Sequence, residues 1–375
     1  MKKCIVIGAG ILGASTAYRL ARLGAEVTVV DRQDAGQATQ AAAGIICPWV
    51  SQRRNQDWYR LAKAGAKYYP ELIRELEAEG ETQTGYARVG ALAIHDDLDK
   101  LDKLEERARQ RQADAPEMGV LSRLEPAAVQ ARFPLLNDGY EALVISGAVR
   151  VDGRELRDAL LRSAARHGAR VVHGDAVVLW EAERATGVRI GEVAYDADEV
   201  IVCAGAWAAP LLEPLGIRLE VGYQKAQIVH LLVQTGEDTG NWPVVMPPST
   251  QYVLAFDGGR IVLGTTHEND PDGYDTRVTA GGMHEVLDKG LCVAGALRDA
   301  TLLEVRVGFR PFTPGFLPVV GRVPGWQGLL VANGLGSSGL TTGPWIGTQL
   351  AKMALGIEPD MAMETYEVGQ AITLI

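Results

Sequence analysis

The sequence predicts a mixed α/β fold in which a parallel sheet covered by helices is joined to an antiparallel sheet. Residues 4–31 read as strand, glycine turn, helix and strand, which is the order of a βαβ unit. Residues 219–263 instead carry apolar runs at 228–233, 252–256 and 260–263, separated by Asp-Gly-Gly and Pro-Pro turns. The first pattern indicates a parallel sheet and the second an antiparallel one.

The remaining elements are expected in a helix-then-strand order. Helical spacing of apolar residues marks the segments 58–79, 98–112 and 154–167, and strands follow at 169–174 and 177–179. The apolar run 199–205 fits a buried parallel strand, and 328–333 is a strand followed by a glycine-rich turn and a helix over 343–355. We therefore expect discontinuous domains. Residues 1–85, 145–218 and 305–375 are assigned to the parallel-sheet domain, and 86–144 and 219–304 to the antiparallel one.

Composition excludes several classes of function. The net charge of -10 repels polyanions, so nucleic acid is not an expected partner. The four cysteines are far apart and the six histidines are scattered, so neither a metal site nor a disulfide framework is predicted. The first apolar run stops at Gly8, far short of the ~20 residues of a membrane span. A cytoplasmic protein without a transmembrane segment is the expectation.

A glycine motif opens the predicted βαβ unit. It consists of Gly8, Ala9, Gly10, Ile11, Leu12 and Gly13, and Asp31 ends the next strand. Gly8 suits a tight turn, Gly10 lets backbone approach a pyrophosphate, and Gly13 lets helix and strand pack closely. The helix start favours phosphate, and Asp31 is placed to accept hydrogen bonds from ribose hydroxyls. This context favours a dinucleotide site over a purely structural turn.

A second glycine motif, Gly334 to Gly339, also follows a strand and opens a helix. Only about 36 residues remain after Gly339, with no strand ending in an acid at the expected ~20-residue spacing, so a separate NAD site is disfavoured. We interpret the motif as a helix start directed at an anionic centre of the cofactor held by the first motif. A reduced flavin has such a centre at N1 and C2=O.

In this order, the motifs resemble the FAD-dependent D-amino-acid oxidase and dehydrogenase family, especially its glycine oxidase and sarcosine oxidase branch. The matching segments span nearly the whole chain: 8–13, Asp31, 39–46, 204–207, 308–311 and 336–344. The resemblance implies a glutathione-reductase-like FAD-binding Rossmann domain joined to an antiparallel-sheet substrate domain. The active site would lie between the two domains.

The resemblance also implies which residues hold FAD. Besides the first glycine motif and Asp31, these are Arg32, Thr39, Ala42, Ala43, Gly44, Ile45, Ile46, Val177, Ala204, Gly205, Trp207, Gly336, Ser337, Ser338, Gly339, Leu340 and Thr341. Small residues at 42–44 would let backbone approach the flavin ring. Sarcosine oxidases attach their flavin to a cysteine near the later Thr-Pro. Since 308–314 contains no cysteine, we expect non-covalent FAD.

Three residues are candidates for the substrate side. By the resemblance, Arg310 in Gly-Phe-Arg-Pro would hold a substrate carboxylate with its planar fork, and Tyr252 would assist. A structural ion pair for Arg310 and simple packing for Tyr252 are the alternatives. His267 is a further pocket candidate. The chain departs from the family at Ala255 and Phe256, where some members have arginine, and at Ser337–Ser338, where glycine oxidases have bulkier and basic residues.

The expected reaction is oxidation of the C–N bond of a small amine or amino acid, a D-amino acid, glycine or an N-methyl amino acid, to an imine that water hydrolyses. Oxygen or another electron acceptor would then reoxidise the flavin. Two alternatives stay open: a 2-hydroxy-acid dehydrogenase on the same fold, and a flavin-binding subunit of a larger electron-transfer complex. The sequence leaves chirality and homo-oligomerisation open.

Overall fold

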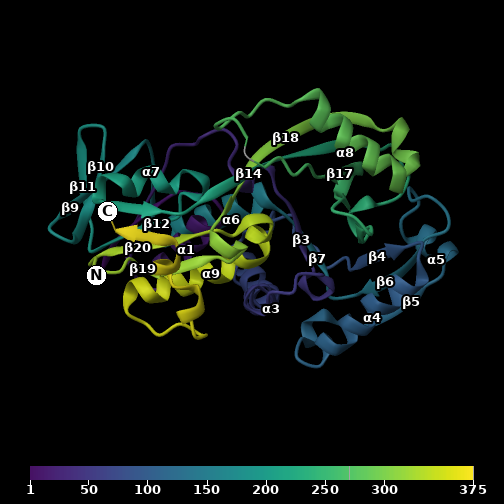
Figure 1. Cartoon of the computed structure of the whole chain (residues 1–375), viewed down its shortest axis with the longest axis horizontal. Coiled ribbons are helices and arrows are strands. Elements are labelled where there is room, and N and C mark those ends of the chain that lie inside the picture. The colour runs from purple at the N-terminus through teal and green to yellow at the C-terminus, as the bar shows by residue number, and fades with distance from the viewer. Residues whose placement is uncertain (270, 375) are drawn as a thin grey trace.

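The computed structural model describes residues 1–269 and 271–374. One half of the molecule is built around a six-stranded sheet and the other around an eight-stranded sheet, and both chain ends lie in the first half (Figure 1). A mixed α/β fold with parallel and antiparallel sheets was predicted, and this prediction is confirmed.

The six-stranded sheet contains the N-terminal βαβ unit. Its order is β19 (Val319–Arg322), β20 (Leu329–Asn333), β12 (Glu199–Val202), β1 (Lys3–Ile7), β2 (Glu26–Asp31) and β8 (Arg170–His173). All neighbouring pairs are parallel except β19 with β20. The carboxyl ends of β1, β2, β12 and β20 therefore meet at one edge of the sheet, which is where ligands bind in folds of this type.

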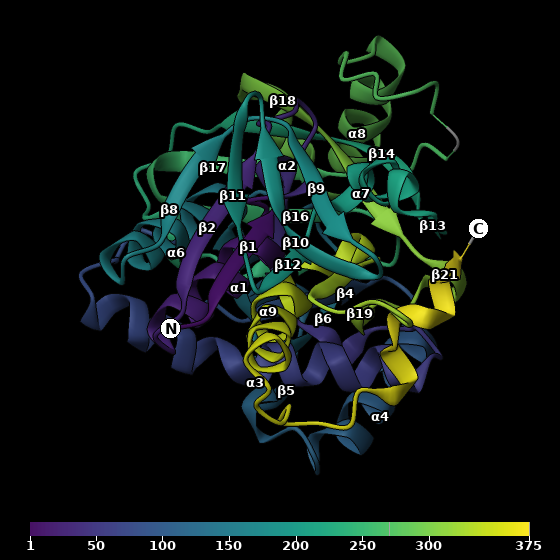
Figure 2. The same ribbon diagram turned by 90° about the vertical axis from the view of Figure 1, so that its left-hand side faces the viewer.

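Alternation along β1 explains how both faces of this sheet are covered. Cys4 and Val6 point to one face and pack into a core formed with helices. Ile5 and Ile7 point to the other face and pack into a second core, formed with a three-stranded sheet. The helices of the first core are α1 (Ile11–Arg22), α3 (Gln56–Ala78), α6 (Gly153–Arg166) and α9 (Gly339–Leu355). The other face carries β9 (Ala176–Glu181), β10 (Arg184–Ile190), β11 (Val193–Asp196) and α7 (Ala208–Leu212), which Figure 2 shows in front.

The eight-stranded sheet forms the other half of the molecule. Its order is β18 (Thr301–Phe312), β14 (Gly222–Leu232), β17 (Arg260–Gly264), β16 (Tyr252–Ala255), β15 (Val244–Met246), β4 (Ala91–His95), β6 (Glu141–Ile145) and β5 (Leu121–Leu124). Helix α8 (Ala280–Val293) packs on the face that carries Val229 and Leu231, and α4 (Leu98–Gln112) and α5 (Pro126–Arg132) lie near β4 to β6. The opposite face carries Ala226 and Ile228, which line a cavity.

Five short elements complete the fold. Helix α2 (Ala38–Ala41) lies against β18, and β3 (Ala43–Ile46) pairs with β7 (Val149–Asp152). Near the C-terminus, β13 (Ile217–Leu219) pairs with β21 (Ile372–Leu374). The boundaries predicted at 144/145 and 304/305 fall inside β6 and β18, so the division into two domains stays a prediction.

Five helices differ from the sequence expectation, and three of them, α2, α5 and α7, are short helices that were not predicted. Helix α9 begins at Gly339, four residues before the predicted start at 343, and a 3₁₀ turn over Gly336–Ser338 precedes it. The second glycine motif is therefore helical at its end rather than an open loop. Helix α8 had no counterpart among the predicted elements. Two buried glycines on its inner face, Gly282 and Gly290, lie against Gln227 and Leu263. Because glycine has no apolar side chain, these buried positions leave no clear helical periodicity in the sequence.

Candidate active site

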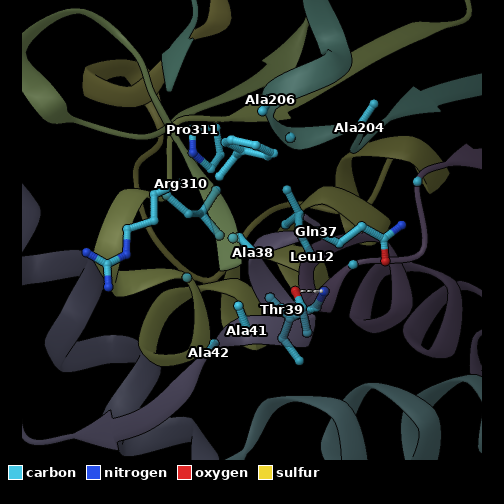
Figure 3. A pocket seen from close by; sticks show the side chains of 18 of the residues that line it. Leu12, Gln37, Ala38, Thr39, Ala41, Ala42, Ala204, Ala206, Arg310 and Pro311 are labelled. Carbon is cyan, nitrogen blue, oxygen red and sulfur yellow. Dashed lines mark hydrogen bonds between the residues drawn. The ribbon is translucent and has the colours of Figure 1, made fainter. Parts of the chain in front are cut away.

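A cavity of about 450 Å³ lies between the two large sheets and extends from the carboxyl ends of β1 and β2 to the inner face of β14 and β18. Figure 3 shows Gln37 and Arg310 at opposite ends of it, with the small residues Ala38, Ala41 and Ala42 between them. The alanines make the middle of the cavity apolar, whereas Gln37 and Arg310 make its ends polar. Such a cavity suits a long ligand with an anionic end.

The first glycine motif forms one wall of this cavity because its backbone must turn tightly there. Gly8 has φ +102, and a Cβ on it would lie 2.5 Å from Cys203 O. A Cβ on Gly13 would lie 1.8 Å from Gly8 O, so the helix can pack on the strand only without a side chain. Gly10 has space in front of it, bounded by Thr39 Oγ1 at 3.4 Å. The motif thus leaves an open cradle at the start of α1 that fits a phosphate group.

Asp31 lies at the end of β2 and is 8% exposed. Its Oδ2 accepts a hydrogen bond from the Ala9 amide at 2.5 Å. Its Oδ1 accepts from the Gln33 amide at 2.6 Å and from Gln37 Nε2 at 2.9 Å. The carboxylate therefore fixes the glycine loop, and it keeps part of its four lone-pair sites for a ligand in the cavity.

Thr39 connects α2 to the start of α1. Its Oγ1 accepts a hydrogen bond from the Ile11 amide at 2.9 Å, drawn as the dashed line in Figure 3. Next along the chain, Gly44 leaves no room for a side chain because a Cβ would lie 2.2 Å from Val151 Cγ2. These contacts position the segment 39–45 along the cavity, which Thr39 and residues 41–45 line.

The second glycine motif meets the same cavity from β20. Asn333 Nδ2 donates to Gly205 O at 2.8 Å, which ties the carboxyl ends of β20 and β12 together. Gly336, Ser337 and Gly339 line the cavity, whereas Ser338 is buried and accepts a hydrogen bond from Trp58 Nε1 at 2.9 Å. The start of α9 therefore faces the same ligand space as the start of α1.

Arg310 lies in β18 at the other end of the cavity and is half-buried. Its Nη2 donates to Thr265 Oγ1 at 3.3 Å, while its Nη1 is buried without a partner. No carboxylate among the described residues forms an ion pair with it, so the structural ion pair considered from the sequence is absent there. Burial lowers the pKa of Arg310, and the interaction with Tyr252 acts in the opposite direction. An anion in the cavity would satisfy this side chain.

Tyr252 and His267 lie close to Arg310 along the cavity. Burial raises the pKa of Tyr252 to about 12, with Arg310 opposing, so its phenol is a neutral donor near pH 7. A Cβ on Gly264 would lie 2.2 Å from the Tyr252 hydroxyl, so this glycine makes room for the ring. His267 is exposed on the cavity rim, where partial burial of its ring and then the charge of Arg310 lower its pKa.

Most of the predicted site residues line this cavity. They are Gly8, Gly10, Ile11, Leu12, Asp31, Arg32, Thr39, Ala42, Ala43, Gly44, Ile45, Ala204, Gly205, Trp207, Tyr252, His267, Arg310, Gly336, Ser337, Gly339, Leu340 and Thr341. Five others do not line it: Ala9, Gly13, Ile46, Val177 and Ser338. Ile46 is 1% exposed in the core, and Val177 is 39% exposed on β9. In β9 the neighbour Ala176 faces the cavity instead, since side chains alternate along a strand.

Several cavity residues were missed from the sequence. They include Asp34, Gln37, Ala38, Ala41, Gly174, Asp175, Ala176, Cys203, Ala206, Leu211, Thr250, Thr265, Phe309, Pro311, Asn333 and Leu335. Many flank a predicted residue directly, so a wider window around each motif would have found them. Thr250 and Thr265 carry no motif and reach the cavity only through the sheet pairing of β16 with β17.

A family model described as FAD dependent oxidoreductase matches residues 3–353. The chain belongs to this family of FAD-dependent oxidoreductases. FAD is accordingly its cofactor, and the glycine cradle at α1, the start of α9 and the long cavity between them fit that molecule.

Relatives of this FAD-dependent oxidoreductase cover its whole length. An uncharacterized oxidoreductase, YurR, of Bacillus subtilis (strain 168) is 59% identical over 372 residues, which is 99% of this chain and 100% of the relative. Glycine oxidase of Pseudomonas putida is 28% identical, with 96% of each chain covered. The crystal structure of an iminodiacetate oxidase from Chelativorans sp. BNC1 is 47% identical, covers 97% of this chain and 98% of its own, and superimposes with a TM-score of 0.94.

The oxidoreductase has other features that bear on its chemistry. Its four cysteines are free, and of these only Cys203 lines the cavity, where burial raises its pKa to about 12. Within residues 1–269 and 271–374, no cluster of histidine, cysteine or acidic residues could hold a metal ion. In the same part of the chain, no helix has the length and apolar character needed to cross a membrane.

Proposed function

We propose that this FAD-dependent oxidoreductase oxidises the C–N bond of a small secondary amine that carries a carboxylate, with iminodiacetate and other N-substituted glycines as the substrate class. The observation that carries the proposal is the buried, unpartnered Nη1 of Arg310 at the end of the cofactor cavity. The similarity to an iminodiacetate oxidase at 47% identity supports the same substrate class.

Each substrate-side residue has a role in this proposal. Arg310 holds the substrate carboxylate with both terminal nitrogens, and Thr265 orients the guanidinium through the Nη2 contact at 3.3 Å. Tyr252 adds a neutral hydroxyl donor, because its pKa of about 12 keeps it protonated. His267 closes the rim of the cavity and, with its pKa lowered, is neutral at physiological pH.

Bound at the glycine cradle and the start of α9, FAD would supply the acceptor for a hydride from the carbon next to the substrate nitrogen. The protein aligns that carbon by fixing the carboxylate at Arg310, which is the main requirement for hydride transfer. The nitrogen loses its proton to water, the C=N bond forms, and water then hydrolyses the imine. For iminodiacetate, hydrolysis of the imine gives glyoxylate and glycine. The two electrons and two protons removed from the amine are accounted for as one hydride, which leaves to the flavin, and one proton, which leaves to water.

The cofactor is proposed to be held without a covalent bond. The segment 308–314 contains no cysteine, and the thiol of Cys203 is protonated at neutral pH because burial raises its pKa to about 12. The residues proposed to contact FAD are the predicted cofactor residues that line the cavity, together with Ala176, and Val177 stays a candidate for a main-chain contact with the adenine. A cytoplasmic location stays a prediction.

An anaerobic substrate panel tests the proposed reaction. The purified holoenzyme is mixed with iminodiacetate, sarcosine, glycine, D-alanine, glycolate and lactate, and flavin absorbance is followed. We expect iminodiacetate or sarcosine to reduce the flavin fastest and the two hydroxy acids to leave it oxidised. Reduction by glycolate or lactate alone would favour the hydroxy-acid alternative. A flavin that none of the amines reduces would favour an electron-transfer subunit.

A further inference from the structure

A stack of three aromatic rings joins the two halves of the molecule beside the cavity. Tyr274 lies between Trp207, at a centroid distance of 5.0 Å and an interplanar angle of 21°, and Tyr223, at 4.7 Å and 16°. Phe309 meets all three rings edge-on, at 5.5 Å from Tyr274. The Tyr274 hydroxyl also donates to Ala206 O at 2.8 Å. Trp207 and Ala206 belong to the turn after β12, whereas Tyr223 and Phe309 belong to β14 and β18.

Only some of these residues face the ligand space. Trp207, Ala206 and Phe309 line the cavity, whereas Tyr274 does not and is 40% exposed. Tyr274 therefore supports the cavity wall from behind. Phe309, which Tyr274 contacts, and Thr276 both lie against Gly36, a few residues after β2, since a Cβ on Gly36 would be 2.4 Å from Phe309 Cε2 and 3.0 Å from Thr276 Cγ2. The ring thus lies beside the cavity end where β2 stops, which is the dinucleotide end of the site.

The segment 271–279 that carries Tyr274 is anchored on the eight-stranded sheet. Lys225, which is 3% exposed, donates from Nζ to Arg277 O at 3.0 Å and lies 3.6 Å from Asp275 Oδ2. The Thr279 amide donates to Gln227 Oε1 at 3.0 Å. One end of the segment is therefore fixed to β14, and the ring of Tyr274 contacts the turn that follows β12. We call this arrangement of segment 271–279 with Trp207, Tyr223 and Phe309 the aromatic clasp.

We propose that the aromatic clasp retains FAD, with Tyr274 acting as a positioning residue that holds Trp207 and Phe309 against the cofactor. The proposal rests on FAD as the cofactor of this chain. Because the clasp spans both halves at the dinucleotide end, Tyr274 opposes movement of the Trp207 wall away from the cofactor space, by stacking and by its bond to Ala206 O. Catalysis itself does not require the hydroxyl of Tyr274.

The test measures FAD release from the holoenzyme. The wild type, Tyr274→Ala, Tyr274→Phe and Val278→Ala are each mixed with an excess of an FAD-binding apoprotein, and transfer of the flavin is followed by fluorescence. Val278 is the matched control because it lies in the same segment, is 46% exposed and has no part in the stack. Melting of the four apoproteins shows whether any change is merely loss of folding stability.

We expect Tyr274→Ala to release FAD roughly 10- to 100-fold faster than the wild type, because two stacked contacts and a hydrogen bond are lost. Tyr274→Phe keeps the stack and should be within about fivefold of the wild type. In a Trp207→Ala background, Tyr274→Ala should add little, since it acts through that ring. Val278→Ala should leave the rate unchanged.

Two results overturn the clasp alone. The first is a Tyr274→Ala release rate within twofold of the wild type in a variant that folds. The second is an equal acceleration by Val278→Ala, which would show a general effect of the segment. A wild type that binds no FAD at all is a different result, because it would overturn the cofactor assignment together with the clasp.

Discussion

The Asp31 carboxylate accepts a hydrogen bond from the Ala9 amide at 2.5 Å, across the glycine turn that precedes α1. Gln33 and Gln37 donate to its other oxygen. The acidic residue expected to bind ribose therefore also holds the phosphate loop in shape. Removal of the Asp31 carboxylate should therefore affect FAD binding in two ways: the ribose loses a hydrogen-bond acceptor, and the phosphate loop loses the contact that holds its shape.

Replacement of Asp31 by alanine should therefore weaken FAD binding strongly. Loss of charge-assisted hydrogen bonds of about 1.5–3 kcal/mol raises the dissociation constant roughly 10- to 100-fold. Asp31→Asn, which keeps one acceptor oxygen, should fall between alanine and the wild type. Titration of the apoproteins with FAD, followed by flavin fluorescence, measures this. An unchanged dissociation constant in a folded Asp31→Ala protein would remove Asp31 from the cofactor site.

Arg310 should matter for substrate and not for folding. Since it has no carboxylate partner among the described residues and its Nη1 is buried alone, Arg310→Met should leave the melting temperature of the substrate-free holoenzyme equal or higher. Substrate affinity should fall by roughly one to two orders of magnitude, which corresponds to about 1.5–3 kcal/mol. Arg310→Lys should restore part of the affinity but not the rate of flavin reduction, because a point charge orients the carboxylate poorly.

Stopped-flow reduction and thermal melting on the same samples separate the two roles of Arg310. A variant that loses flavin and melting temperature together would indicate a structural residue. Normal reduction of the variant at low substrate concentration would place the carboxylate elsewhere.

His230 should make folding stability fall in acid. It is 2% exposed with neither ring nitrogen bonded, and burial, followed by the nearby Arg306, lowers its pKa to about 3. An unfolded histidine titrates near 6.5, so between about pH 6.5 and 3 the unfolded chain binds a proton that the folded chain does not. Stability is fully present above that range and is lost as pH falls, by up to about 1.4 kcal/mol per pH unit.

Denaturant unfolding at several pH values measures this slope. His230→Leu should flatten the acid limb, and the same change at exposed His284 should leave the slope as in the wild type. An acid limb of equal steepness in His230→Leu would show that other groups control it.

The flavin should be released by heat or acid. The only cysteine on the cavity wall is Cys203, whose pKa of about 12 leaves it protonated and a poor nucleophile. The protein should be yellow, and the supernatant after precipitation should contain all of the FAD. Yellow colour that stays with the precipitated chain would contradict non-covalent binding.

The sequence predicted the nucleotide-binding half well because its signals are local. The glycine turn at Gly8, the strand that ends at Asp31 and the strand before Gly334 each lie within a few residues of the features they predict. The reason for glycine at position 13 is equally local, because a Cβ there would lie 1.8 Å from Gly8 O. A family resemblance across the whole chain then joined these segments into one site.

The eight-stranded sheet was predicted only in part because its pairing is long-range. β4 and β15 pair in parallel although about 150 residues separate Ala91 from Val244, and short runs such as these carry little periodicity alone. For the same reason Thr265 was missed at the site, since its place depends on how β14 and β17 are aligned. Val177 was expected to contact the cofactor through its main chain and this stays a prediction; its neighbour Ala176 is the residue of β9 that lines the cavity.

The most direct test of the proposed reaction is an anaerobic single turnover of the holoenzyme with iminodiacetate, with the products counted against the flavin reduced. We expect one glyoxylate and one glycine for each FAD bleached, and almost no bleaching at the same substrate concentration in Arg310→Ala. Flavin that stays oxidised with iminodiacetate and with every N-substituted glycine, or that is bleached by glycolate with no amine released, would contradict it.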